Sequence, residues 1–161
     1  MKLYYNPIST YSQKTMIAFN EKRIAYEPAL VDLGSPVGRA AYAAINPLGK
    51  VPFLVASDDW VVPESTIIIE FLEDRFPDTP RLIPTDKEAA RQVRFIDRLA
   101  DLYLNNQVIE LLFQQIGFKP KDADSAERVR KYVELTYSHW DKRLASQPWL
   151  CGDNFTMADC S

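Results

Sequence analysis

Cysteine, histidine and glycine are scarce in this sequence, which has two cysteines, one histidine and five glycines among its 161 residues. Cys151 and Cys160 lie away from the single histidine, His139, so neither a disulfide framework nor a zinc site is indicated. No apolar run reaches the roughly 20 residues that a membrane-spanning helix needs, and the N-terminus lacks the apolar core of a signal peptide. We therefore expect a cytoplasmic protein that holds no metal.

An excess of charge of one sign is also missing. The formal net charge is -3, from 19 basic and 22 acidic residues that are scattered along the chain. Nucleic-acid-binding proteins usually carry a basic patch, so we expect no nucleic-acid partner, and no membrane partner either. The content of 47% hydrophobic and 25% charged residues is typical of one or two small globular domains.

Short strands and helices alternate in the first half of the sequence. Strand character is found at residues 2–5, 24–31, 52–56 and 60–62, and helical character at 13–22, 35–45 and 64–76. Ser57, Asp58 and Asp59 separate the last two strands as a hairpin turn does, and Pro28 suits an edge strand. This βαβ-α-ββα order predicts a small mixed sheet with helices on both faces and a right-handed parallel crossover.

The second half is predicted to be helical throughout. Apolar residues recur at helical spacing from a capping box at Thr85 and Glu88 to about Phe118, and a second long helix is expected over residues 122–144, capped by Asp124. A further capping box, formed by Thr156 with the acid at position 159, stands near the end of the sequence. The proline-rich residues 77–84 are predicted to be the linker between the two domains.

Four polar features of the first half lie where a ligand can bind. They are the hydroxyl-rich turn of Ser9, Thr10, Tyr11 and Ser12, the residue Lys50, the dipeptide Val51-Pro52, and the pair Glu64-Ser65. Backbone N–H groups at a helix start favour an anion. Each feature also has a plain interpretation: Ser12 and Ser65 as helix caps, a trans proline at a strand start, and a surface lysine.

Taken together and in this order, the features resemble the cytosolic glutathione S-transferases. The similarity lies in YYNPISTYSQK, NPLGKVPFL, PESTIIIEFLEDRFP and PWLCGDNFTMAD, and it extends over nearly the whole chain. It implies a thioredoxin-like N-terminal domain over residues 1–76 and an all-helical domain over 85–161. It further implies a homodimer, for which Phe71, Phe76 and the helix after Asp86 offer apolar surface, and a natural chain that continues beyond Ser161 with more helix.

The resemblance also implies how glutathione is held. Val51, preceding a cis proline, pairs through its main chain with the cysteinyl part of the tripeptide. Glu64 and Ser65 hold the γ-glutamyl end, and Lys50 contacts the glycyl part. Some members carry basic residues before the proline loop, for which Arg39 is only a weak substitute.

The resemblance implies that the turn stabilises the glutathione thiolate, which is the reactive form of the thiol. Lowering a thiol pKa by about two units takes about 2.7 kcal/mol, and one hydrogen bond to a charged group supplies about 1.5–3 kcal/mol. Ser9 has the spacing of the serine-type members and is our choice of donor, while Tyr5 is the alternative. Because the turn has no cysteine, we do not expect disulfide exchange, and Tyr11 stands where cysteine-type members carry their thiol.

The expected activity is transfer of glutathione to a small apolar electrophile. Candidates for the electrophile pocket are Ile8, Tyr11, Tyr103 and Phe113, although helical spacing makes the last two equally typical of core residues. Isomerase, dehalogenase and peroxidase activities use the same thiolate, and sequence alone does not choose among them. The alternative from another class is a non-catalytic relative that serves in ligand binding or protein docking.

Overall fold

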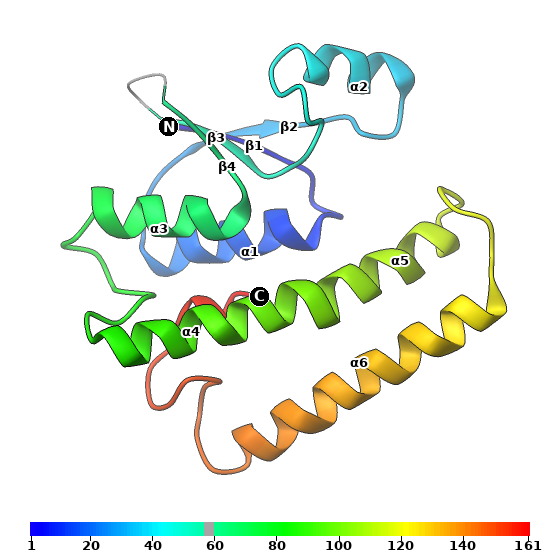
Figure 1. Cartoon of the computed structure of the whole chain (residues 1–161). Helices are drawn as coiled ribbons and strands as arrows, with labels where there is room; N and C mark the ends of the chain where they lie inside the picture. The colour runs from blue at the N-terminus through cyan, green and yellow to red at the C-terminus, as the bar shows by residue number, and fades with distance from the viewer. Residues whose placement is uncertain (57–59) are drawn as a thin grey trace. The chain divides into compact units, whose positions relative to one another are not determined.

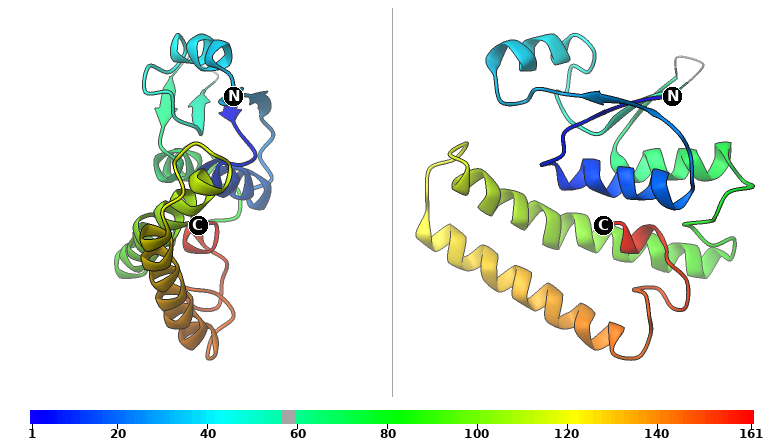
Figure 2. Two further views of the ribbon diagram at one scale, coloured as in Figure 1. Left: turned by 90° about the vertical axis from the view of Figure 1, so that its right-hand side faces the viewer. Right: turned by 180° about the vertical axis from the view of Figure 1, so that it is seen from behind.

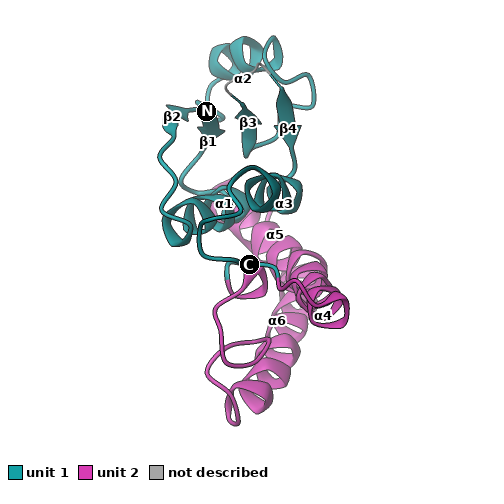
Figure 3. Ribbon diagram, turned by 90° about the vertical axis from the view of Figure 1, so that its left-hand side faces the viewer, with its two compact units in different colours: residues 1–83, 160 teal, residues 84–159, 161 magenta. Residues whose placement is uncertain are grey.

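The computed structural model describes residues 1–56 and 60–161, so the predicted turn of Ser57, Asp58 and Asp59 lies outside the described residues. The chain forms two compact units (Figure 3). The first unit comprises residues 1–83 with Cys160, and the second comprises residues 84–159 with Ser161.

The described part of the first unit is a mixed sheet covered by helices on both faces. Its strands are β1 (Lys2–Tyr5), β2 (Glu27–Leu30), β3 (Phe53–Val55) and β4 (Val61–Pro63), and its helices are α1 (Thr10–Glu21), α2 (Pro36–Ala43) and α3 (Ser65–Arg75). The sheet order is β2-β1-β3-β4, in which β1 pairs parallel with β2 and antiparallel with β3, and β4 pairs antiparallel with β3. Helices α1 and α3 cover one face and α2 lies at the other (Figure 1). The predicted thioredoxin-like arrangement, with Pro28 on an edge strand, is confirmed.

Strand periodicity divides the core of this unit between the two faces. Successive side chains of a strand point to opposite faces, so Leu3 and Leu54 face α1 and α3, whereas Tyr4 and Phe53 face α2. The first set packs with Phe19, Val62, Ile68 and Leu72, and the second packs around Val31 and Tyr42. Burying large apolar side chains at about 1.5–3 kcal/mol each supplies the main stabilisation of the sheet.

The start of α1 differs from the prediction. The N-cap is Ser9, not Ser12, because Ser9 has extended backbone angles (φ -76°, ψ 117°) and its Oγ accepts the backbone N–H of Ser12 at 3.2 Å. Ser12 lies one turn inside the helix, fully buried, and its Oγ accepts the backbone N–H of Asn6 at 3.3 Å. Both oxygens are therefore occupied by amides, but the capping role belongs to Ser9.

Three further helix starts also differ from the predicted caps. Helix α3 begins at Ser65, and the N-cap position is held by Glu64 without a side-chain hydrogen bond. Helix α4 (Lys87–Leu99) is capped by Asp86 instead of Thr85, because its carboxylate accepts the N–H groups of residues 88 and 89. Helix α6 (Ala123–Leu144) is capped by Asp122 instead of Asp124. The Asp122 carboxylate accepts the N–H groups of residues 124 and 125.

The second unit is helical, as predicted, with one change of winding. Helix α4 continues into a π-helix (Ala100–Asn105) and then into α5 (Asn106–Gln115), which runs beside α6 (Figure 2). The predicted capping box at Thr156 is confirmed, since the Asp159 carboxylate accepts both the N–H and the hydroxyl of Thr156 at 2.9 Å. A 3-10 turn, Met157–Asp159, follows it. Across the described residues, no helix has the length and apolar character needed to cross a membrane.

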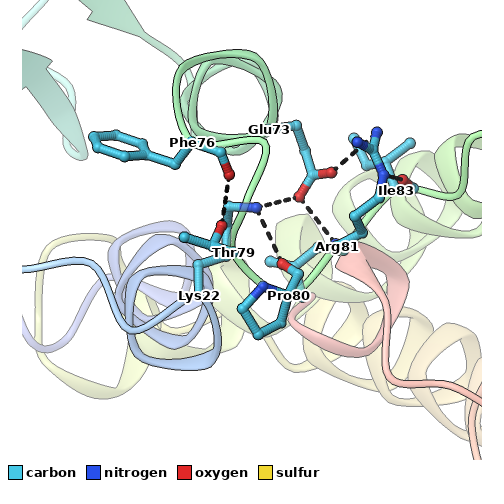
Figure 4. Close-up of polar contacts among 8 residues, drawn as sticks. Lys22, Glu73, Phe76, Thr79, Pro80, Arg81 and Ile83 are labelled. Carbon is cyan, nitrogen blue, oxygen red and sulfur yellow. Dashed lines mark hydrogen bonds and ion pairs between the residues drawn. The ribbon is translucent and has the colours of Figure 1, made fainter.

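Most of the proline-rich segment predicted as a linker belongs to the first unit, where a buried ion pair holds residues 80–82 (Figure 4). Lys22 Nζ donates to Glu73 Oε1 at 2.6 Å, and the two side chains are only 1% and 5% exposed. The same ammonium donates to the Pro80 carbonyl at 3.1 Å, and the Leu82 N–H donates to Glu73 Oε1 at 2.9 Å. Glu73 Oε2 has the Arg81 guanidinium 3.4 Å away, without hydrogen-bond geometry. The pair therefore joins α1, α3 and residues 80–82.

Gly38 in α2 lies where an added side chain would clash with Asp32. A Cβ added there would lie 2.4 Å from the Asp32 carbonyl oxygen and 2.7 Å from the Asp32 Cβ. We expect Gly38→Ala to lower the free energy of unfolding by about 1–3 kcal/mol, measured by urea denaturation, because the helix must move away from the loop. Gly34→Ala is the control, since its Cβ would meet only Asp32 Oδ1 at 3.4 Å. Equal stability of Gly38→Ala and the unmodified protein would contradict the prediction.

Candidate functional site

The sheet register brings three predicted site segments to one end of the sheet. Tyr4 pairs with Phe53, and Phe53 pairs with Pro63. The end of β1 therefore lies beside the start of β3, which lies beside the end of β4. The Ser9 turn follows β1, the Val51-Pro52 loop precedes β3, and α3 follows β4. We call this the site end of the sheet.

Asn6 builds the turn between β1 and α1. Its side chain donates to the Val31 carbonyl at 3.0 Å and accepts the Ile8 N–H at 3.0 Å, while its backbone carbonyl accepts the Ser9 N–H at 3.0 Å. These bonds tie the turn to the neighbouring end of β2. Ile8 itself is 58% exposed, so its side chain is available to the predicted electrophile pocket.

Ser9 keeps its hydroxyl hydrogen available. Its Oγ acts as the acceptor for the cap of α1, and within the described residues it donates no hydrogen bond. A hydroxyl has two acceptor lone pairs and one donor, so capping does not compete with donation to a sulfur atom. The N-terminal amides of α1 add positive potential at the same place.

Tyr5, the alternative donor, is engaged in the core. It packs against the Leu3–Phe19 cluster on the α1 and α3 face of the sheet. The pKa of Tyr26 is raised, first by burial and then by the nearby Tyr5. Tyr26 precedes β2 at the level of Met1, the end of β1 opposite the turn. Tyr5 is nevertheless the last residue of β1 and pairs with Leu30, so it too stands at the site end of the sheet and stays the alternative donor.

The loop before β3 has the predicted cis peptide bond between Val51 and Pro52. Asn46, which is 4% exposed, accepts the Leu48 N–H at 3.2 Å through its side chain and the Gly49 N–H at 2.8 Å through its carbonyl. Gly49 has φ 63°, a conformation that glycine adopts without cost. Within the described part of the chain, neither the N–H nor the C=O of Val51 has a hydrogen-bond partner. Both groups can therefore pair with a peptide.

The side chain of Lys50 is available to a ligand, whereas that of Arg39 is engaged in hydrogen bonds within the protein. The Lys50 side chain is exposed, as contact with a ligand carboxylate requires. Arg39 Nη1 donates to the carbonyls of Leu33 and Gly34, both at 2.9 Å, so it stabilises the loop before α2.

The start of α3 combines a helix N-terminus that lacks a side-chain cap with an unusual backbone. Glu64 has φ 69° and ψ 127°, which a non-glycine residue adopts at a cost of about 1–3 kcal/mol, often at functional sites. Ser65 is 4% exposed and stands at the first helical position. The next residue, Thr66, accepts a hydrogen bond at 3.0 Å from Lys14, a buried lysine of α1. A positive group and a helix N-terminus therefore adjoin the residues expected to hold a carboxylate.

Tyr103 and Phe113, predicted to line the electrophile pocket, belong to the second unit. Tyr103 lies in the π-helix and is 48% exposed, whereas Phe113 lies in α5 and contacts Phe118 edge to face at 5.6 Å. Their part in a pocket with Ile8 and Tyr11 stays a prediction.

Asp101, on the π-helix, is buried, and His139 is exposed on α6. The described residues contain no cluster of three or more histidine, cysteine or acidic side chains that could hold a metal ion.

Sequence reasoning missed the residues that shape this end of the sheet. Asn6 accepts the Ser9 N–H, and Lys14 donates to Thr66, the neighbour of Ser65. Asn46 and Tyr42 donate to the Lys50 carbonyl at 2.9 and 2.7 Å. The asparagines directly precede Pro7 and Pro47, and an asparagine before a proline is a turn signal that could have indicated them. Tyr42 and Lys14 carry no such signal.

Comparisons with known proteins identify the family of this chain. The family model described as "Glutathione S-transferase, N-terminal domain" matches residues 3–80, and the corresponding C-terminal domain model matches residues 123–161. Maleylacetoacetate isomerase from Pseudomonas aeruginosa is 31% identical, over 99% of this chain and 76% of that protein. The chain belongs to the glutathione S-transferase family.

Two further similar proteins extend the comparison. A solved glutathione S-transferase from Methylobacillus flagellatus, with glutathione bound, is similar to this chain with a TM-score of 0.86 and 31% identity, covering 99% of this chain and 77% of that one. A stringent starvation protein A homolog from Coxiella burnetii is 28% identical over 99% of this chain and 71% of that protein. The proteins similar to this chain thus carry different names.

Proposed function

We propose that this chain binds glutathione at the site end of the sheet and stabilises its thiolate for attack on a small electrophile. The observation that carries the proposal is the convergence of a free hydroxyl donor on Ser9, an unpaired main chain at Val51 and an uncapped helix start at Ser65. A hydroxyl donor suits a thiolate, an unpaired main chain suits a peptide, and a helix start suits a carboxylate. Glutathione contains a thiol, a peptide and carboxylates. The similar structure with glutathione bound supports the choice of ligand.

The proposed roles follow from the chemistry of each group. Ser9 donates to the sulfur, and Val51 pairs with the cysteinyl main chain. Glu64 and Ser65 hold the γ-glutamyl end, where the amides of α3 favour a carboxylate. Lys50 contacts the glycyl carboxylate.

Isomerisation is the second candidate activity, because a similar protein is named maleylacetoacetate isomerase. It requires the same bound thiolate, which adds to the substrate and leaves again. A non-catalytic docking role is the third, given the similarity to a stringent starvation protein A homolog.

A homodimer and a cytoplasmic location remain predictions. Phe71 and Phe76, suggested for the dimer contact, pack against the core of the first unit and offer less free surface than expected.

Calorimetric titration with reduced glutathione, followed by turnover assays, tests the proposal. We expect glutathione to bind in a one-to-one ratio and an aryl halide to be conjugated at a rate that depends on protein concentration. A maleyl-substituted keto acid, assayed with glutathione, tests isomerisation. Binding without either reaction would support the docking role, and absence of binding would overturn the proposal altogether.

A further inference from the structure

The Lys50 carbonyl is held by two donors from the segment that begins in α2. Tyr42 donates through its hydroxyl at 2.7 Å, and Asn46 donates through Nδ2 at 2.9 Å. Both donor residues are buried, with 3% and 4% of their surface exposed. Two buried donors on one carbonyl, in a loop, fix its direction more firmly than a solvent-exposed turn would.

Tyr42 is itself fixed in place by the sheet. Its ring lies 5.9 Å from the Tyr4 ring, centroid to centroid, and belongs to the cluster formed with Val31 and Phe53. Burial raises the pKa of Tyr42, against a smaller lowering by a hydrogen bond with Asn46. Because the ordinary pKa of tyrosine is already near 10, the hydroxyl remains a donor throughout the neutral range.

The direction of this carbonyl determines the direction of the next N–H group. The Lys50 C=O and the Val51 N–H belong to one planar peptide unit, and in a trans unit they point to opposite sides. Fixing the oxygen toward Tyr42 and Asn46 therefore aims the Val51 N–H away from them. Within the described residues, that N–H has no partner.

We propose that Tyr42 and Asn46 are positioning residues that aim the Val51 N–H at the cysteinyl carbonyl of glutathione. The inference rests on the proposed function, because it assumes that glutathione is the peptide bound there. It predicts that removing either donor weakens glutathione binding while the chain stays folded.

Two variants remove the donors with little change of shape. Tyr42→Phe keeps the ring and deletes the hydroxyl, and Asn46→Asp keeps the acceptor for the Leu48 N–H but loses Nδ2. We expect the Kd for reduced glutathione, measured by calorimetry, to rise about three- to tenfold in each. The stoichiometry should stay at that of the unmodified protein. Tyr4→Phe is the matched control, since Tyr4 packs in the same cluster without touching the Lys50 carbonyl, and its Kd should not change.

The folded fraction separates positioning from general loosening of the fold. Reversible loosening raises the apparent Kd only in proportion to the competent protein that is lost, so a variant that urea denaturation shows to be almost fully folded owes a three- to tenfold rise in Kd to positioning. An unchanged Kd in both variants, with or without lower stoichiometry, would overturn the inference while the proposed function stands. If the unmodified protein binds no glutathione, both this inference and the proposed function fail.

Discussion

Replacing Ser9 with alanine is expected to reduce the rate of glutathione conjugation about ten- to a hundredfold and to raise the pKa of the bound thiol. The reason is loss of one hydrogen bond to the thiolate, for which about 1.4–2.7 kcal/mol corresponds to that range of rates. Affinity for glutathione should change little, because the peptide contacts lie at Val51, Glu64 and Ser65. Initial rates with an aryl halide and ultraviolet titration of the bound thiolate provide the two measurements.

Ser9 is also the cap of α1, so this variant needs controls for stability. Removing a serine cap costs about 0.5–2 kcal/mol of stability. Ser35→Ala removes the matching cap of α2, where the hydroxyl accepts the Gly38 N–H at 3.0 Å, and should leave the thiol pKa unchanged. Ser9→Thr keeps both the cap and the donor and should restore most of the rate. Full activity of Ser9→Ala, together with loss of activity in Tyr5→Phe, would transfer the role to Tyr5.

Replacing Glu73 with alanine is expected to lower the free energy of unfolding by about 3–5 kcal/mol. The variant leaves the Lys22 ammonium buried without its counter-ion, which is among the most destabilising single changes. It also removes the acceptor for the Leu82 N–H, so residues 80–82 lose their bond to α3. Urea denaturation of the full chain measures the effect.

A double substitution tests whether the cost comes from the unpaired charge. Lys22→Met with Glu73→Leu replaces both ions by apolar side chains, which is often neutral or stabilising, so most of the lost stability should return. Glu27→Ala serves as a control for an exposed pair, Lys2–Glu27, whose side chains are 41% and 65% exposed, and should change stability little. A double variant that is as unstable as Glu73→Ala would show that the hydrogen bond to residue 82, not the charge, dominates.

The order of strands and helices was predictable from periodicity, whereas the helix starts were not. Asp122 and Asp124 are equally good caps by residue type, and Thr85 and Asp86 are both of types that cap helices. The choice depends on which residue takes extended backbone angles, and this is set by the chain as a whole. The π-helix was missed because its apolar residues continue the spacing of an ordinary helix.

Sequence motifs indicated the residues proposed to bind the ligand, but they did not indicate the residues that hold those residues in place. Lys22 and Glu73 are 51 positions apart, and each taken alone resembles a surface residue of an amphipathic helix. Tyr42 is likewise an aromatic residue at core spacing, and only the structure shows that its hydroxyl reaches the Lys50 carbonyl. Supporting contacts of this kind depend on tertiary pairing, which one sequence does not reveal.

The double use of Ser9 restricts which residues position 9 can tolerate. Starting α1 requires a short side chain with an acceptor, and holding a thiolate requires a donor. Alanine lacks both groups, and an ionised aspartate has only the acceptor. Serine, threonine and asparagine carry both. Selection for folding alone would therefore favour serine, threonine, asparagine and aspartate at this position, and of these only aspartate lacks the donor. Most replacements that keep the cap thus keep the group proposed for chemistry, even in descendants that no longer need it.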